Sequence, residues 1–275
     1  ATVHDGVILG NNLNIAVSKS NTIEVVNKNT LVSVVQIVPT PAQGNTPRDI
    51  VIDGKYVYVS MYTGVVSRID PSTNTIDKTV AVGPNPEEMV IVNKSLYVTN
   101  SDGNNYNAGY ANGKSVSKIS LSDFVEEKKI AVGLNPTKIT ADALGNVLVL
   151  CMGDYSATPA TVWKINAEDE ATSMNIPATI MDIKDNSLYV INAPYGAPSI
   201  TYTVYNTSSG AVEKENFVSA PVDAPAGIAV HSDGRIFITS NTLVGGFASF
   251  KTPGYVCVYS SDGTFVKKYD VGVGA

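Results

Sequence analysis

The chain has 275 residues, of which 44% are hydrophobic and 16% are charged, and its formal net charge is −6 at pH 7. So much apolar surface with so little net charge excludes an intrinsically disordered chain. The acidic balance argues against nucleic acid and anionic membranes as partners, because phosphates and anionic headgroups attract basic surfaces. The 22 glycines, 14 prolines and 14 tyrosines are typical of pleated strands separated by many turns, so the composition predicts a soluble all-β protein.

The start of the sequence shows neither the basic nor the apolar segment of an export signal, so such a signal has been removed or was never there. No stretch approaches the roughly 18 consecutive apolar residues of a membrane helix. Cys151 and Cys257 each lie in an apolar run, which predicts two buried free thiols rather than a disulfide framework or a zinc cluster.

One phrase recurs along the chain: a proline, a strand, a tight turn and a second strand. A degenerate copy opens the sequence, with Asp5 in the place of the proline. Five clearer copies begin at Pro47, Pro86, Pro136, Pro177 and Pro225. Spacings of roughly 40 to 50 residues are typical of propeller blades. The six repeats cover approximately residues 1–44, 45–83, 84–133, 134–175, 176–222 and 223–275.

The repeat that begins at Pro47 shows four predicted strands, Ile50–Ile52, Tyr56–Ser60, Val65–Ile69 and Thr75–Val82. Asp53-Gly54 between the first two supplies the positive φ that a hairpin turn needs. A four-stranded sheet of this size cannot bury both faces alone, whereas copies stacked around an axis can. We therefore predict one β-propeller domain over residues 1–275, with six four-stranded antiparallel blades. The alternative is seven blades, one of them outside this sequence.

Two phrases carry a resemblance to a known family. Residues 96–100 read LYVTN, and Val-Gly-x-Asn-Pro recurs at 82–86 and 132–136, which resembles the YVTN-type propeller repeat over nearly the whole chain. The last repeat has an insertion at 241–254, a Tyr-Ser-x-x-Gly turn at 259–263 and a final Val-Gly. These features are similar to surface propeller lipoproteins of gut bacteria, a family that includes cobalamin-capturing proteins capping an outer-membrane transporter. The chain differs from that family in having no cysteine at its start and six repeats where seven are usual.

Insertions are expected at one end of the propeller, which we call the loop end. In this topology the loops from strand two to three share that end with the loops from strand four to the next strand one. The long ones cover 101–113, 153–159, 193–199 and 241–254. They carry the aromatic residues Tyr106, Tyr110, Tyr155, Tyr195, Phe247 and Phe250, and the short loop of the second repeat carries Tyr62. Insertions on one face with aromatic rings between polar residues are typical of recognition surfaces. The alternative is that the rings only pack the loops onto the rim.

The mouth at the loop end should be lined by residues after each proline and after each second strand. These are Arg48, Glu87, Thr137, Ala178 and Ala226, and Met61, Ser101, Met152, Ala193 and Asn241. One arginine opposite a glutamate, beside thioethers, suits a neutral or zwitterionic organic molecule, although a solvent-filled pore fits equally. The predicted ligand-binding residues are Arg48, Met61, Tyr62, Glu87, Asn100, Tyr106, Tyr110, Met152, Tyr155, Asn192, Tyr195 and Phe247.

Residues for catalysis are scarce. Of the two histidines, His4 is predicted at the loop end and His231 in a turn at the opposite end, so they cannot share a metal ion. Gly245-Gly246 is not a phosphate-binding loop, and the Asp-Gly turns lack the alternating acidic ligands of a calcium loop. We therefore predict no catalytic residues, no cofactor and no metal site.

The leading hypothesis is a non-catalytic propeller at the cell surface or outside the cell. It would hold a small organic ligand, cobalamin-like by the resemblance, and feed an outer-membrane transporter. We expect a monomer with no nucleic-acid partner and no membrane span. The alternatives are a structural or protein-interaction module of a cell-surface layer or receptor complex, and a lactonase- or lyase-type propeller enzyme.

Overall fold

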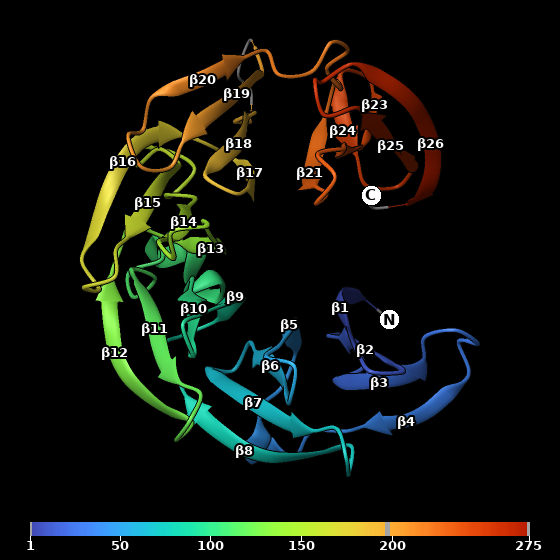
Figure 1. The fold of residues 1–275 in the computed structure, drawn as a ribbon, viewed down its shortest axis with the longest axis vertical. Helices are drawn as coiled ribbons and strands as arrows, with labels where there is room; N and C mark the ends of the chain where they lie inside the picture. The colour runs from blue at the N-terminus through green and yellow to red at the C-terminus, as the bar shows by residue number, and fades with distance from the viewer. Residues whose placement is uncertain (1, 196–198, 274–275) are drawn as a thin grey trace. The chain divides into compact units, whose positions relative to one another are not determined.

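The computed structural model describes residues 2–195 and 199–273. It contains six four-stranded antiparallel sheets, five of them formed by four consecutive strands and the last interrupted by a hairpin, which confirms the all-β fold class and the six blades of a β-propeller (Figure 1). The only helices among these residues are two short 3-10 turns, η1 (Pro41–Gln43) and η2 (Gly103–Ala108). No helix in this stretch of the chain is long and apolar enough to cross a membrane.

The chain divides into two compact units, and each is described by itself. Unit 1 comprises residues 1–141, 145–159 and 163–173, and unit 2 comprises 142–144, 160–162 and 174–275. The expectation of a single domain stays a prediction.

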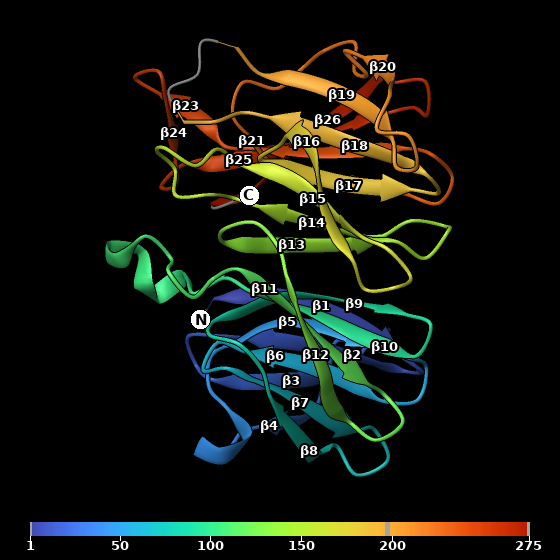
Figure 2. The same cartoon turned by 90° about the vertical axis from the view of Figure 1, so that its left-hand side faces the viewer.

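Unit 1 holds the first three sheets and most of the fourth. Their strands, β1 to β16, are labelled in Figure 2. The first two sheets are β1 (Val3–Leu9), β2 (Asn12–Val17), β3 (Thr22–Asn27) and β4 (Ser33–Ile37), then β5 (Pro47–Ile52), β6 (Val57–Met61), β7 (Val65–Asp70) and β8 (Thr75–Ala81). The third is β9 (Pro86–Val92), β10 (Ser95–Asn100), β11 (Ser115–Ser120) and β12 (Val125–Ala131). The fourth is β13 (Pro136–Ala141), β14 (Val147–Cys151), β15 (Thr161–Ile165) and β16 (Ala171–Pro177).

Unit 2 holds the last two sheets. One is β17 (Ile180–Lys184), β18 (Ser187–Asn192), β19 (Thr201–Asn206) and β20 (Val212–Glu215). The other is β21 (Pro225–Val230), β22 (Ile236–Ser240), β25 (Pro253–Tyr259) and β26 (Phe265–Val273). Between its second and third strands lies a separate hairpin, β23 (Thr242–Val244) and β24 (Phe247–Ser249).

Local turn chemistry explains where the strands begin and end. In the turn between β5 and β6, Gly54 has φ of 90°, and the Asp53 carboxylate accepts backbone hydrogen bonds from Lys55 at 2.8 Å and Tyr56 at 2.7 Å. Glycine adopts this φ without steric cost, and aspartate stabilises the turn by bonding the backbone that follows it. The four strands predicted for this repeat are confirmed, although β5 begins earlier than expected, at Pro47.

Apolar side chains fill the space between neighbouring sheets. Ile23 and Val25 of the first sheet pack with Val57 and Val59 of the second, and all four are buried. In unit 2 the ring of Phe217 makes edge-on contacts with the rings of Tyr189 and Tyr202. This burial is the main driving force for stacking the sheets. The prediction for the cysteines is confirmed, because both are free and buried.

The two kinds of loop predicted at the loop end do meet there. In five blades the first residue after the second strand donates a backbone hydrogen bond to the residue just before the first strand. These bonds run from Ser18 to Thr2 at 2.9 Å, Tyr62 to Thr46 at 3.0 Å, Ser101 to Asn85 at 3.1 Å, Met152 to Asn135 at 2.8 Å and Asn241 to Ala224 at 3.0 Å. Residues of both loops are therefore placed side by side in each of these blades.

Within each unit, carboxylates on innermost strands join neighbouring sheets. Asp5 on β1 accepts a hydrogen bond from the backbone N–H of Ile50 at 3.4 Å, and Asp49 on β5 accepts one from Met89 at 2.7 Å. In unit 2, Asp182 on β17 accepts one from Val230 at 2.6 Å. We call these contacts the inter-blade latches.

Strand register corrects the alignment of the first repeat. Val3 pairs with Val17 as Pro47 pairs with Met61, so Val3 and not Asp5 takes the place of the proline. The expectation for Asp5 was wrong because the first copy is degenerate and offers no proline to anchor it. The shift places His4 at the position of Arg48.

The fifth repeat needs a similar correction. Pro177 ends β16 instead of opening β17, and Met181 pairs with Val190 as Met89 pairs with Val98. Ala178 therefore takes the place of the proline, and the residue that follows it is Thr179. The alignment by proline was wrong by one position because the last strand of the fourth blade runs on through Pro177.

Candidate functional site

Three side chains on consecutive innermost strands form an ionic group at the loop end of unit 1. Arg48 on β5 donates to Glu87 Oε2 from Nε at 2.8 Å and from Nη2 at 2.5 Å. Its Nη1 lies 3.1 Å from Nε2 of His4 on β1. The three residues meet because each occupies the same register position on a neighbouring strand, immediately after the proline or its equivalent.

A tyrosine and a serine from the adjoining loops complete the group. The guanidinium carbon of Arg48 lies 4.8 Å from the ring centroid of Tyr62, a cation–π contact. The Tyr62 hydroxyl is in hydrogen-bonding contact with Glu87 and Ser101, and Ser101 Oγ donates to Glu87 Oε1 at 3.3 Å. We call His4, Arg48, Tyr62, Glu87 and Ser101 the Arg48 cluster.

The ion pair in the cluster is partly shielded from water. The Arg48 side chain is 28% exposed and that of Glu87 is 13% exposed. Burial, and then the charge of Glu87, raises the pKa of Tyr62, so its hydroxyl stays protonated. Burial and the nearby Arg48 lower the pKa of His4. Because Arg48 can only donate, Nε2 of His4 accepts, and the ring is neutral.

The short loop after β6 and the long loop after β10 are held by specific contacts. Asn85, with φ of 49°, donates from Nδ2 to the carbonyl of Tyr62 at 2.9 Å and accepts at Oδ1 from the N–H of Asn104 at 3.0 Å. A Cβ at Gly103 would lie 2.1 Å from the Tyr62 hydroxyl, so any other residue there would have to displace the Tyr62 side chain. The loop backbone and Tyr62 therefore fix each other.

Asn135 has a comparable role in the next blade. Its φ is 56°, and Nδ2 donates to the carbonyl of Gly153 at 3.3 Å. In the sequence, the Asn-Pro pairs at both places indicate the repeat, but they do not by themselves reveal that the asparagine side chain holds a loop. The signal that could have found it is the recurrence of asparagine, which tolerates positive φ, directly before both prolines.

Two tyrosines from different loops lie together beside the cluster. The rings of Tyr110 and Tyr155 are 6.2 Å apart between centroids and inclined by 61°, an edge-to-face arrangement. Tyr155 is 65% exposed, and the charge of Glu87 is among the influences that raise its pKa, after burial and Tyr110. Tyr106 on η2 is 63% exposed. Unit 1 thus presents aromatic surface next to an ionic group.

Two of the predicted ligand-binding residues point into the protein. Met61 is fully buried in the core between the first two sheets, so the expectation that it lines the mouth is wrong. Asn100 is also fully buried, and its Nδ2 donates to Ser115 Oγ at 3.0 Å and Ser117 Oγ at 2.9 Å. Both residues end a second strand, where the alternation of side chains directs them inward.

The other predicted residues are spread over both units. In unit 1, Met152 is half-buried at the start of its loop. In unit 2, Asn192 is half-buried at the end of β18, whereas Tyr195 is 93% and Phe247 is 65% exposed. Residues 196–198 of the predicted loop 193–199 lie outside the described residues. Within unit 1, the structure therefore groups Arg48, Tyr62, Glu87, Tyr110 and Tyr155.

A second group of charged side chains lies one residue further along the innermost strands. Lys138 on β13 donates from Nζ to Glu88 Oε1 at 3.1 Å and Oε2 at 3.3 Å. Burial, followed by the charges of Glu88 and Asp5, raises the pKa of Asp49 well above its usual value.

Within residues 2–195 and 199–273, no group of three or more histidine, cysteine or acidic side chains could hold a metal ion.

Comparisons with known proteins give the fold and nothing finer. No family model matches the chain, and no curated protein matches its sequence. Solved structures do match it. Hydrazine synthase of Kuenenia stuttgartiensis has a TM-score of 0.68 at 15% identity, over 92% of this chain and 74% of that one.

Two further structures are similar. The computationally designed Ika8 protein has a TM-score of 0.67 at 11% identity, over 98% of this chain and 75% of its own. Dihydro-heme d1 dehydrogenase NirN, in complex with DHE, has a TM-score of 0.62 at 11% identity, over 96% of this chain and 55% of its own. Proteins with the names of enzymes and a designed protein thus share this fold. By its strands and its structural neighbours, the chain is a β-propeller of six four-stranded blades.

Proposed function

We propose that this protein is a non-catalytic binding propeller that holds a small organic ligand at the loop end of unit 1. The observation that carries the proposal is the Arg48 cluster beside the pair of the half-buried Tyr110 and the exposed Tyr155. Few, well-placed polar groups next to aromatic surface are typical of small-molecule sites. Exposed rings on anchored loops supply contact area at a low entropic cost.

The charges in the cluster favour a ligand without a large net charge. Arg48 and Glu87 neutralise each other, so a strongly charged ligand would have to disrupt their ion pair. A guanidinium carries five N–H donors, and Arg48 uses Nε and one on each Nη toward Glu87 and His4. Two donors are left for an acceptor oxygen, such as an amide carbonyl or a hydroxyl.

The resemblance of the repeats to cobalamin-capturing surface propellers makes a corrinoid the first ligand to test. A corrinoid is a large, flat molecule with amide groups at its edge, and it would match both the aromatic surface and the free donors. The same resemblance supports the proposal that the protein acts as a monomer outside the cell or at a bacterial cell surface. Its partner there would be an outer-membrane transporter.

Isothermal titration of the whole chain with cyanocobalamin, and with common glycans as comparison ligands, tests the proposal. Replacing both Tyr110 and Tyr155 with Ala should weaken binding about 10-fold or more, since aromatic contacts dominate such sites. Tyr269→Ala, a half-exposed tyrosine on the outer strand β26, is the matched control and should bind as the native protein does.

Absence of heat with every ligand would contradict the small-molecule proposal. Turnover of a lactone or of the bound ligand would contradict its non-catalytic aspect and favour a lactonase- or lyase-type enzyme.

A protein-docking role is the second candidate, and one observation in unit 2 favours it. The hairpin β23–β24 exposes Leu243, Val244 and Phe247, and Phe250 follows it at 72% exposure. An apolar group of this kind on a surface is typical of an interaction site. Pull-down from cell-surface extracts with the native chain and with a Phe247→Ser, Phe250→Ser variant would separate this role from ligand binding in unit 1.

A further inference from the structure

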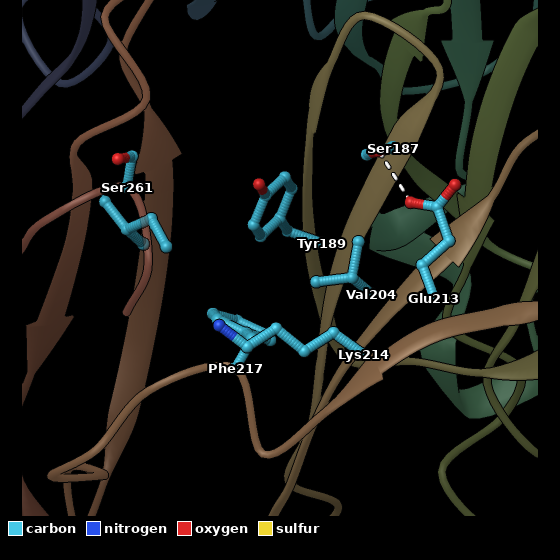
Figure 3. Close-up of a pocket in the computed structure, with 8 residues that line it drawn as sticks. Ser187, Tyr189, Val204, Glu213, Lys214, Phe217 and Ser261 are labelled. Carbon is cyan, nitrogen blue, oxygen red and sulfur yellow. Dashed lines mark hydrogen bonds between the residues drawn. The ribbon is translucent and has the colours of Figure 1, made fainter. Parts of the chain in front are cut away.

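Unit 2 contains a cavity that the proposed function does not use. Its volume is about 170 Å³, and residues of both sheets of the unit line it (Figure 3). One side comes from β18 to β20, and the other from β22 and the turn between β25 and β26. That turn and the start of β18 lie at the end of the blades opposite to the loop end, so the cavity is distinct from the Arg48 cluster.

The floor of the cavity is apolar and shaped by rings. Val204, Phe217 and Ile236 are each at most 4% exposed and contribute the floor. Tyr189 stands over Phe217 with ring centroids 5.3 Å apart and planes at 87°. For comparison, an apolar cavity of roughly 150 Å³ holds one benzene molecule. The size and lining therefore fit a single aromatic ring.

Two hydroxyl groups of the cavity have no hydrogen bond among the described residues. One belongs to Tyr189 and the other to Ser261. Figure 3 shows the Tyr189 hydroxyl directed away from the floor, on the side of Ser261. Burial is the first cause that raises the pKa of Tyr189, so this hydroxyl is a protonated donor at neutral pH. Tyr189 is half-buried and Ser261 is exposed at the mouth, so a ligand that enters can pair with both hydroxyls.

The charged residues at the rim are already engaged. Glu213 accepts from Ser187 Oγ at 2.6 Å and from Asn206 Nδ2 at 2.9 Å. Lys214 donates from Nζ to the carbonyl of Asp262 at 2.5 Å. A ligand does not need a charge to enter, because both charged side chains that line the cavity already have partners.

We propose that this cavity is a second binding site, for a phenol: a single aromatic ring that carries one hydroxyl. The ring lies on Val204, Phe217 and Ile236, and its hydroxyl hydrogen-bonds with those of Tyr189 and Ser261. Neither contact involves the Arg48 cluster, so a test of this site and a test of the proposed function have independent outcomes.

Methyl-detected NMR of the full chain, titrated with phenol, tests the site. The methyl groups of Val204 and Ile236 should shift with saturation, with a Kd on the order of 1 mM, as expected for a ligand of this size. Toluene fills the same space without a hydroxyl and should bind several-fold more weakly. Tyr189→Phe keeps the ring contact with Phe217 and should weaken phenol binding about 5-fold, the usual effect of one lost hydrogen bond.

Two further variants complete the experiment. Ser261→Leu places an apolar side chain at the mouth and should abolish the shifts. Tyr269→Phe removes a hydroxyl from β26, far along the outer strand, and should leave the titration unchanged. If Ser261→Leu is unfolded, Tyr189→Phe still decides, because it alters no packing. The proposal is overturned if phenol does not shift the Val204 and Ile236 methyls, or if Tyr189→Phe binds phenol as tightly as the native protein.

Discussion

The two units are built from the same four-stranded sheet but differ in what their innermost strands carry. At the position after the proline, unit 1 has His4, Arg48, Glu87 and Thr137, whereas unit 2 has Thr179 and Ala226. At the next position unit 1 has Asp5, Asp49, Glu88 and Lys138, whereas unit 2 has Ile180 and Gly227. The blade therefore does not need charge at these positions.

This difference separates the residues that make the fold from those that make a site. Apolar side chains between sheets and turn residues recur in both units. The charged positions are filled only in unit 1, and there they form a connected group instead of scattered surface charges. Side chains that the fold does not require, yet that contact one another, are the better candidates for function.

The largest expected effect comes from breaking the ion pair of unit 1. Glu87→Ala leaves the shielded Arg48 guanidinium without its carboxylate and removes one hydrogen-bonding contact of Tyr62, whereas Ser101 keeps its bond to the Asn85 carbonyl at 2.8 Å. We expect the free energy of unfolding to fall by about 3 kcal/mol, because an uncompensated, partly buried charge is costly. Urea denaturation followed by circular dichroism measures it. Thr137→Ala, at the same register position, should change stability by less than about 0.5 kcal/mol, and equal losses in both variants would contradict the special role of Glu87.

The next effect concerns the latch that both units share. Asp182→Ala removes the acceptor for the backbone N–H of Val230 in unit 2. Leaving a backbone donor unpaired should cost about 1 to 2 kcal/mol. Asp182→Asn keeps an acceptor oxygen and should recover most of the loss in the same denaturation experiment. If Asn and Ala are equally destabilising, the carboxylate charge and not the hydrogen bond is what matters.

In unit 1, the charge on the latch residue Asp49 should lower the stability of the folded protein, whereas the hydrogen bond of the latch raises it. The raised pKa of Asp49 means that the folded state retains a proton which the unfolded chain, with a pKa near 3.8, releases. Stability from this group is therefore complete at low pH and is lost as pH rises from about 4 through the raised pKa. Asp49→Asn keeps an acceptor for Met89 and should increase the free energy of unfolding at pH 7. The variant should be more stable because asparagine does not ionise and so avoids the cost of charging this buried group.

A matched control comes from an aspartate with the opposite shift. Hydrogen bonds from Ser260 and then from Thr264 lower the pKa of Asp262 to about 2, so its contribution is present above pH 4 and is lost on acidification. Asp262→Asn should lower stability at pH 7 where Asp49→Asn raises it. Melting temperatures recorded from pH 4 to 7 check both signs, and a destabilised Asp49→Asn would show that its charge is favourable after all.

The smallest effect is expected at the aromatic loop of unit 2. Phe247 is 65% exposed, so Phe247→Ser should change stability by less than about 0.5 kcal/mol. Thermal unfolding measures this directly. A large loss would mean that the hairpin β23–β24 supports the fold, and it would remove the observation that favours protein docking.

Local sequence was sufficient to predict the blades. Turns such as that at Asp53-Gly54 act through the backbone of adjacent residues, and the apolar alternation on each side of them decides where strands lie. The alignment of the repeats on the strands was harder to predict than the strands themselves. Nothing local distinguishes Pro177 at the end of β16 from the prolines that open β5 or β9.

The repeat pattern also predicted part of the candidate site. Arg48 and Glu87 occupy one repeat position on neighbouring strands, so the repeat alone placed them together. Met61 and Asn100 were misjudged because the last residue of a strand can face either the core or the mouth, and packing decides which.

The sequence by itself determined the repeat, the number of blades and the end at which the loops lie, since each depends on short-range turn chemistry and on a pattern copied along the chain. Only the tertiary structure decided that His4 joins Arg48, that Asn85 holds the loop around Tyr62, and that unit 2 has a cavity beneath Tyr189. These contacts join residues far apart in the chain, and their geometry depends on how whole sheets pack against one another.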